Sequence, residues 1–304
     1  MAAAQDLSIV DPHIHLWDTR YVRYPWLERR GLAFSGDNRL LPDPYLVQQL
    51  LREATDVEVL RSVHVEANPA DAVTEVQWLQ ALADDPVNRG HPHGIVAYAD
   101  LTAADVAATL ERLSAFRNVR GIRQIVNRHE DVRYNYVDRD FLNDPIWRAN
   151  LRRLLSYNWS FDLQLYPHQV SSALEVIESI PGLTFIVNHT GMFVDRSGAL
   201  GWRQWRQALR DLASYSNVAI KISGLAMFDH EWTIESFRPY VLEAIDVFGA
   251  DRCLFASNFP IDRLHGSYGA LWRAYTDLID GAAEPERERM LRSNAIRYYR
   301  LQPL

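Results

Sequence analysis

Short apolar runs rich in β-branched residues alternate along the chain with longer segments of helical period. Eight such runs predict strands, at residues 7–10, 59–65, 94–97, 121–126, 160–165, 184–187, 218–222 and 252–256. Between the runs, apolar residues recur at spacings of three and four, as in Val106, Leu110 and Leu113. This spacing is typical of a helix with one core-facing stripe. The pattern therefore predicts regular alternation of strands and helices.

Alternating strands and helices favour an α/β protein with a parallel sheet, and eight strands are the number that closes a TIM barrel. The predicted fold is a single, slightly distorted (β/α)8 barrel, forming one domain over residues 1–304. A doubly wound open sheet is the alternative, but no Gly-x-Gly-x-x-Gly motif follows the first strand. Residues 19–46 are rich in Tyr, Trp, Pro and Arg. They are expected to form a long first loop over the barrel mouth.

Composition narrows the class of protein. Hydrophobic residues make up 48% and charged residues 23%, as in an ordinary globular enzyme, and the net charge of −7 argues against nucleic-acid binding. No leader-like segment opens the chain and no apolar run is long enough for a membrane span, so a cytoplasmic protein with a small-molecule substrate is expected. The composition is compatible with either a monomer or a homo-oligomer. The single cysteine, Cys253, excludes a multi-cysteine metal site, and Lys221 is the only lysine.

The most informative motif follows the first predicted strand, in the sequence Asp11-Pro12-His13-Ile14-His15. Side chains alternate along a strand, so the two histidines point the same way, roughly 6.6 Å apart along the backbone. Two imidazoles at a strand end can hold a metal ion or polarise a carbonyl group. The plainer interpretation is a pair of hydrogen-bonding loop histidines.

Other polar residues follow the remaining strands. In a TIM barrel, the carboxyl ends of the strands together form the active site. The side chains expected there are Glu66 after the second strand, Arg123 on the fourth, Gln164 and Tyr166 at the fifth, His189 after the sixth, and Asn258 and Asp262 after the eighth.

These motifs resemble those of the amidohydrolase superfamily, and more closely its lactonase-like amidohydrolase 2 branch, which includes fuconolactonase and pyrone-dicarboxylate lactonase. The resemblance rests on Asp11-x-His13-x-His15, on His189-x-Gly191 and on Ser257-Asn258-Phe259-Pro260, and it runs essentially end to end. It implies a hydrolase that opens a lactone. It further implies that His13, His15 and His189 polarise the lactone carbonyl, directly or through one divalent metal ion, zinc or manganese. Whether a metal is bound stays open.

The chain departs from the family pattern at Asn258, where the family has a carboxylate that activates water. An amide has no useful basicity near neutral pH, so Asn258 could orient water but not act as a general base. The candidate bases are Glu66, Asp262 and His189. Their structural alternatives are an ion pair with an arginine for Glu66, a turn or helix cap for Asp262 and a buried hydrogen-bonded side chain for His189.

A substrate pocket is expected around these groups. Arg123 suits bidentate capture of a substrate carboxylate, with a salt bridge to Glu66 as the alternative. The aromatic residues predicted to wall the pocket are Trp17, Tyr24, Trp26, Tyr166 and Phe259. The predicted activity is hydrolysis of a lactone in a small anionic or polyhydroxylated substrate. The alternatives are a non-hydrolytic isomerase or decarboxylase, or a catalytically silent barrel that binds a small molecule.

Overall fold

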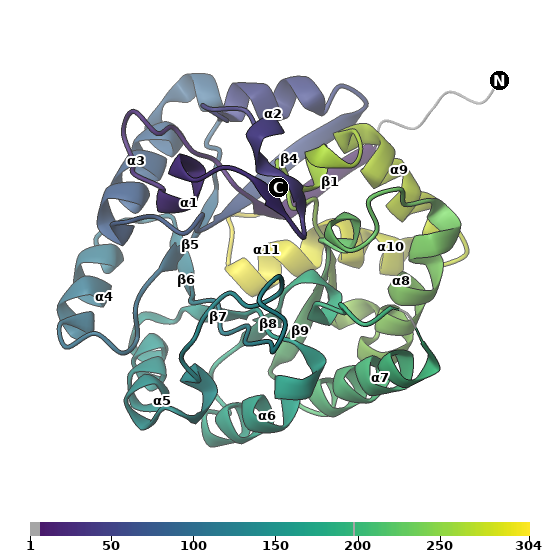
Figure 1. Ribbon diagram of the computed structural model, residues 1–304. Coiled ribbons are helices and arrows are strands. Elements are labelled where there is room, and N and C mark those ends of the chain that lie inside the picture. The colour runs from purple at the N-terminus through teal and green to yellow at the C-terminus, as the bar shows by residue number, and fades with distance from the viewer. Residues whose placement is uncertain (1–6, 197) are drawn as a thin grey trace.

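The computed structural model describes residues 7–196 and 198–304; the start of the chain, where the sequence predicts no leader, lies outside these residues. Within them, a parallel eight-stranded sheet forms the centre of the molecule, with helices around it (Figure 1). In sheet order the strands are β1 (Leu7–Ile14), β4 (Val57–Val65), β5 (Gly94–Tyr98), β6 (Val119–Arg123), β7 (Ser160–Leu163), β8 (Phe185–Val187), β9 (Val218–Ile222) and β10 (Cys253–Phe255). Each overlaps a predicted strand, although the bounds differ by several residues in β1 and β6.

The sheet closes on itself through a short contact between its first and last strands. Ile14 forms a parallel bridge with Phe259, just beyond β10. The backbone N–H of Asn258 donates to the His13 carbonyl at 2.9 Å, and that of His15 donates to the Phe259 carbonyl at 2.7 Å. The predicted slightly distorted TIM barrel is therefore confirmed. The same contact joins two motif-bearing segments from opposite ends of the chain.

The helices begin where the sequence provides caps. The Asp71 side chain accepts a hydrogen bond from the backbone N–H of Thr74, and Asp144 precedes a proline at the first helical position. The helices around the barrel are α2 (Val47–Glu53), α3 (Ala72–Asp84), α4 (Val106–Ser114), α5 (Pro145–Leu151), α6 (Val170–Ser179), α7 (Ala199–Ala213), α8 (Ile234–Phe248) and α9 (Tyr268–Leu278), followed by α10 (Glu284–Glu288) and α11 (Asn294–Tyr299). None of the helices in the described residues is both long and apolar enough to cross a membrane.

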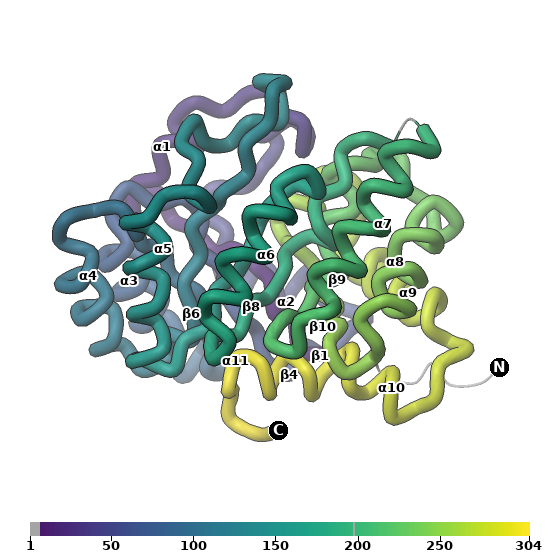
Figure 2. The backbone as a smooth tube through the Cα atoms, turned by 90° about the horizontal axis from the view of Figure 1, so that it is seen from below, coloured from purple at the N-terminus to yellow at the C-terminus, as the bar shows by residue number. Residues whose placement is uncertain are grey.

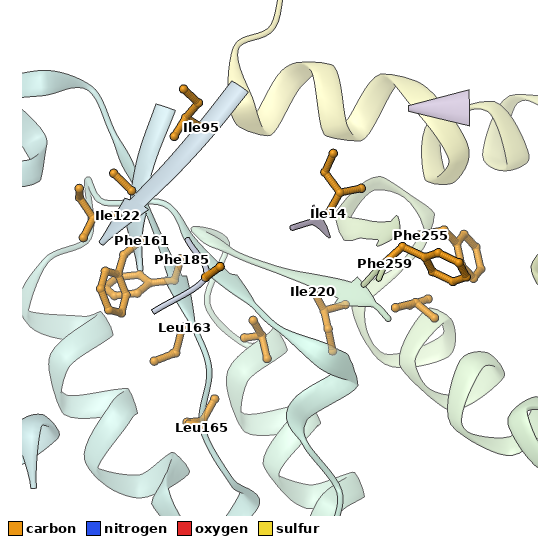
Figure 3. Packing of buried hydrophobic residues seen from close by; sticks show 14 of the residues in the cluster. Ile14, Ile95, Ile122, Phe161, Leu163, Leu165, Phe185, Ile220, Phe255 and Phe259 are labelled. Atoms are coloured by element: carbon orange, nitrogen blue, oxygen red, sulfur yellow. The ribbon is translucent and has the colours of Figure 1, made fainter. Parts of the chain in front are cut away.

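Alternation along the strands divides the buried side chains into two layers. On β9, Val218, Ile220 and Ile222 belong to the large core between strands and helices, whereas Ala219 belongs to a smaller core. Figure 3 shows part of the large core, including Phe161 and Phe185 on neighbouring strands. The smaller core takes its side chains from alternate strand positions together with the C-terminal segment; its buried members are Val10, Val63, Val65, Val96, Ile186, Ala219, Leu254, Ala295, Tyr299 and Leu301.

The two ends of the barrel are covered by opposite parts of the chain (Figure 2). The C-terminal helix α11 lies at one end. At the other end lies the loop after β1, which contains the short helix α1 (Pro25–Glu28) and a hairpin of β2 (Leu32–Ala33) and β3 (Gly36–Asp37). The long loop predicted over the barrel mouth is thus present and carries small elements of its own.

Candidate active site

A cavity of about 310 Å³ opens at the carboxyl ends of the strands. Its lining combines polar side chains from the strand ends with aromatic side chains from the loops. The lining residues are His15, Trp17, Trp26, Ala33, Phe34, Ser35, Asn38, Ala67, Asn68, Arg123, Ile125, Arg133, Asn135, Tyr136, Gln164, His189, Met227, Asn258 and Ile261. No aspartate or glutamate from the described part of the chain lines it. Two arginines do, so the cavity is suited to an anionic ligand.

The three predicted histidines meet beside this cavity. The ring of His13 lies 5.0 Å from that of His15 and 4.6 Å from that of His189, measured between centroids. His15 and His189 line the cavity, whereas His13 is fully buried and does not. Burial lowers the pKa of all three well below the usual value, with help from Arg123 and, for His13 and His189, also from Lys221. The cluster is therefore neutral near pH 7.

The backbone determines which nitrogen of His15 carries the proton. His15 Nδ1 lies 2.7 Å from the carbonyl oxygen of Val65, which can only accept a hydrogen bond. In the neutral ring the proton is therefore on Nδ1, and Nε2 keeps its lone pair. Nε2 lies 3.3 Å from Asn258 Oδ1, a second acceptor. Two adjacent acceptors at a cavity wall leave the lone pair of Nε2 available to a donor such as a water molecule.

His13 faces a cation instead of a carbonyl group. Lys221 Nζ lies 3.2 Å from His13 Nδ1 and donates to Asp162 Oδ1 at 2.6 Å. Tyr299 and Asn188 also donate to Asp162, at 2.9 Å each to Oδ1. Burial lowers the pKa of Lys221 to about 8, and Asp162 opposes that shift. The sequence singled out Lys221 only as the sole lysine; its contact with the histidine cluster is a finding of the tertiary structure.

His189 is held in a strained backbone conformation after β8. Its φ is +52°, in the left-handed region that non-glycine residues rarely adopt. The His189 Nδ1 lies 3.1 Å from Ser223 Oγ. A Cβ atom on Gly224, itself at φ +65°, would come within 2.6 Å of that Nδ1, so glycine is needed there for the ring to fit. Asn258 shares the left-handed conformation, at φ +58°. Such strain is concentrated at functional sites.

Arg123 and Glu66 form the ion pair that the sequence left as an alternative. Arg123 Nε donates to Glu66 Oε1 at 2.6 Å, and both side chains are almost completely buried. The second Glu66 oxygen accepts from the backbone N–H of Asn68 at 2.6 Å. Glu66 does not line the cavity, so its carboxylate faces arginine and backbone groups and not substrate.

Arg123 still presents donors to the cavity. Of its five N–H groups, three donate, to Glu66 Oε1, the Glu66 carbonyl and Gln164 Oε1, which leaves two free. Because the side chain lines the cavity, these two can bind an oxygen of the substrate.

Asp262 lies behind Asn258. Asn258 Nδ2 donates to Asp262 Oδ1 at 2.7 Å, and Asp262 does not line the cavity. Burial raises the pKa of Asp262 to about 8, so the carboxyl group is largely protonated at neutral pH. The arrangement orients the Asn258 amide, and it gives Asp262 no contact with the cavity.

The aromatic residues predicted as pocket walls divide into two groups. Trp17 and Trp26 line the cavity, and their indole N–H groups donate to the carbonyls of Pro42 and Ala67. They therefore offer apolar faces to a ligand. The other three predicted walls are buried outside the cavity lining: Tyr24, Tyr166 and Phe259.

Several lining residues had no sequence motif to mark them. Phe34 and Asn38 come from the loop after β1, and Arg133, Asn135 and Tyr136 from the loop after β6. The run Arg-Tyr-Asn-Tyr at residues 133–136 is a signal that could have drawn attention, since aromatic and polar residues alternate in it. The Oδ1 of Asn38 is buried and without a hydrogen-bond partner among the described residues.

The donor set matches a divalent metal ion poorly. No three His, Cys, Asp or Glu side chains within residues 7–196 and 198–304 are arranged to hold one ion. His13 contacts an ammonium group, and an amide stands at Asn258 in place of an anionic ligand. A dication there would also lie near the guanidinium of Arg123, and the nearby carboxylate of Glu66 is already paired with that guanidinium.

Comparison with known proteins agrees with the fold and the strand-end motifs. The amidohydrolase family model matches residues 10–301. The uncharacterized protein y4mH of Sinorhizobium fredii is 41% identical over 301 residues, covering 97% of this chain and 99% of that protein. An L-fucono-1,5-lactonase of Burkholderia ambifaria is 27% identical, with 96% and 95% covered.

Among solved structures, a zinc-bound amidohydrolase from Burkholderia multivorans superimposes with a TM-score of 0.80 at 22% identity, covering 97% of this chain and 99% of that one. This similarity supports the barrel fold. Since the family model spans nearly the whole chain and a relative at 41% identity covers it end to end, the protein belongs to the amidohydrolase family.

Proposed function

We propose that this protein hydrolyses the ester bond of a small lactone that carries an anionic group. The observation behind this is the pair of acceptors, His15 Nε2 and Asn258 Oδ1, side by side at a cavity that also contains free guanidinium N–H groups of Arg123. A water molecule and a carbonyl oxygen can be bound together there. The similarity to an L-fucono-1,5-lactonase supports the same reaction class.

The proposed reaction needs only this chain's residues and water. Water donates to His15 Nε2, beside Asn258 Oδ1, and its oxygen adds to the lactone carbonyl carbon as His15 takes the proton. The developing oxyanion accepts hydrogen bonds from Arg123. When the ring C–O bond breaks, His15 returns the proton to the leaving alkoxide, and the product is a hydroxy acid. His189 borders the same cavity and helps to position the substrate.

Arg133 is the proposed anchor for the anionic group. It lines the cavity from the loop after β6 and pairs with Asp131, while its side chain remains mostly exposed and free to reorient. The lining offers no acidic side chain from the described residues that would repel an anion. The proposal takes no metal ion as cofactor, which the ammonium contact of His13 and the amide at Asn258 support.

A panel of sugar lactones, muconolactones and pyrone carboxylates, assayed by pH-stat, tests the activity. Hydrolysis of a carboxylated lactone is expected, with His15→Asn reducing kcat by about 100-fold or more, in the range usual for a general base. Arg133→Gln should raise KM for the carboxylated substrate and leave a neutral lactone unaffected. No turnover of any panel member by folded protein would contradict the proposal.

A second candidate is a non-hydrolytic reaction on a similar substrate, favoured by the amide at Asn258 in place of a water-activating carboxylate. Running the reaction in ¹⁸O-labelled water separates the two candidates. Only hydrolysis incorporates the label into the product carboxylate.

A further inference from the structure

Lys221 contacts one ring nitrogen of His13 in the interior of the barrel. Its Nζ lies 3.2 Å from His13 Nδ1, and both side chains are completely buried. An ammonium group has three N–H donors and no acceptor, so Nδ1 must be the acceptor in this contact. A neutral imidazole has one N–H, and for His13 that N–H is consequently at Nε2.

The ammonium is itself fixed in place. Asp162 accepts from Lys221 Nζ at 2.6 Å, and the same carboxylate accepts from Tyr299 and Asn188. The Lys221 Nζ also lies 5.1 Å from the centre of the Tyr299 ring. A buried lysine with a carboxylate and an aromatic face as partners has little freedom to release His13.

A histidine with its proton on Nε2 can donate to an oxygen there but has no lone pair for a metal ion. To become a ligand through Nε2, His13 would have to move that proton to Nδ1, where it would face the hydrogens of the ammonium. We propose that Lys221 is a positioning residue that holds His13 as a hydrogen-bond donor and thereby prevents the histidine cluster from binding a divalent metal ion.

The Nε2 atom of His13 supports this role. It is buried and has no hydrogen-bond partner among the described residues, while the rings of His15 and His189 lie within 5.0 Å of its own. A buried donor without a partner is costly and is expected only where a ligand atom completes it. His13 does not line the cavity, so the acceptor that fits this N–H donor is the oxygen of a buried water molecule between His13 and the cavity.

The tautomer can be measured directly on the wild-type protein. Nitrogen-15 NMR of histidine-labelled protein distinguishes protonated from unprotonated ring nitrogens, and the His13 signals are those missing from His13→Asn. We expect His13 with its proton on Nε2 and His15 with its proton on Nδ1. A His13 proton on Nδ1 in the wild-type protein would overturn the proposal, and this measurement needs no variant of Lys221.

Zinc binding gives a second, independent measurement. Protein stripped with a chelator is titrated with zinc in competition with a chromogenic chelator. The double variant Lys221→Met, Asp162→Asn removes the ammonium without leaving an unpaired carboxylate. It should bind zinc about 10–100-fold more tightly than the wild-type protein, the usual range for residues that orient metal ligands. Equal zinc affinities in the two proteins would contradict the proposal.

Tyr299→Phe is the matched control, because it removes one partner of Asp162 and leaves the contact between Lys221 and His13 in place. Its His13 tautomer and zinc affinity should equal those of the wild-type protein. A zinc affinity raised as far as in the double variant would show that any loosening of the network has this effect and would refute the specific role of Lys221.

The catalytic consequence rests on the proposed lactonase function. If that function holds, the double variant should lose kcat by about 10–100-fold with little change in KM, because His13 packs against the rings of His15 and His189 and positions them, while the residues that line the cavity are unchanged. If the protein hydrolyses none of the lactones, the proposed function is wrong. The tautomer and zinc results would still decide the role of Lys221.

Discussion

Glu75 illustrates how burial changes a single side chain in this protein. It lies on α3, completely buried, and its Oε1 accepts from the backbone N–H of Ala67 at 3.1 Å. Its Oε2 has no partner among the described residues, and His64 Nε2 lies 3.6 Å from Oε1. Burial raises the pKa of Glu75 to about 7 and lowers that of His64 to about 3. His64 is therefore neutral near pH 7 and provides no positive charge to balance the Glu75 carboxylate.

This shift predicts a pH dependence of stability. The folded pKa of Glu75 lies above its unfolded value near 4.3, so the folded state holds the proton more tightly, and stability is lost as pH rises from about 4 to about 7. Glu75→Gln removes the titration. Its stability relative to wild type should improve as pH rises from about 4 to about 7, as measured by urea unfolding. Parallel stability curves for the two proteins would show that Glu75 does not titrate in this range.

The buried ion pair of Arg123 and Glu66 predicts a large loss of stability when only one of its charges is removed. Arg123→Met leaves a buried carboxylate without its cation and should lower the free energy of unfolding by about 3–5 kcal/mol. The double variant Arg123→Met, Glu66→Leu removes both charges and should recover much of that loss. Urea unfolding of the two single variants and the double variant gives the coupling energy, and additive effects would contradict a direct ion pair.

At the scale of elements, the hairpin of β2 and β3 is held over the cavity by two histidines from distant loops. His230 Nε2 donates to the Phe34 carbonyl at 2.8 Å, and His265 Nε2 donates to the Ser35 carbonyl at 2.7 Å. The two rings stack with centroids 4.0 Å apart and an interplanar angle of 8°. Since Phe34 and Ser35 line the cavity, this contact positions part of its wall.

His265→Leu should therefore loosen the hairpin without unfolding the barrel. Loss of one hydrogen bond is worth about 0.5–1.5 kcal/mol, so amide hydrogen exchange in residues 32–37 should accelerate by about 2–10-fold. His265→Gln, whose amide can donate from nearly the same place as Nε2, is the matched control and should stay close to wild type. Unchanged exchange in the leucine variant would mean that other contacts hold the hairpin.

For the whole molecule, the C-terminal segment completes the interior of the barrel. Tyr299 donates to Asp162, and Ala295 and Leu301 belong to the smaller core. The Nδ2 of Asn294 donates to the carbonyls of Ala250 and Cys253, at 2.7 and 2.8 Å. The far end of the chain is thus part of the same structure that holds the histidine cluster.

Deletion of residues 294–304 should abolish cooperative unfolding, because it exposes the smaller core and removes a partner of the buried Asp162. Thermal unfolding followed by near-ultraviolet circular dichroism measures this. Deletion of residues 302–304, which are exposed, is the control and should change the midpoint little. A sharp transition at the wild-type temperature in the longer deletion would contradict the prediction.

The sequence alone determined the barrel and the centre of its site. Strand positions follow from local alternation of apolar residues, which depends on neighbours a few positions away, and the motifs at His13, His15, His189 and Asn258 mark strand ends that any closed barrel brings together. The ion pair of Arg123 with Glu66 was one of two interpretations, because strand periodicity predicts an inward arginine but not its partner.

Only the tertiary structure decided the contacts between residues far apart in the chain. Lys221 and His13 are 208 positions apart, and whether an ammonium reaches that imidazole depends on strand register and on Asp162 beside it. The same holds for the tautomer of His15, which the Val65 carbonyl determines, and for the loop residues that close the cavity. Periodicity reports which face a side chain occupies, whereas proton positions and partners depend on distances of a few tenths of an ångström that only the folded chain establishes.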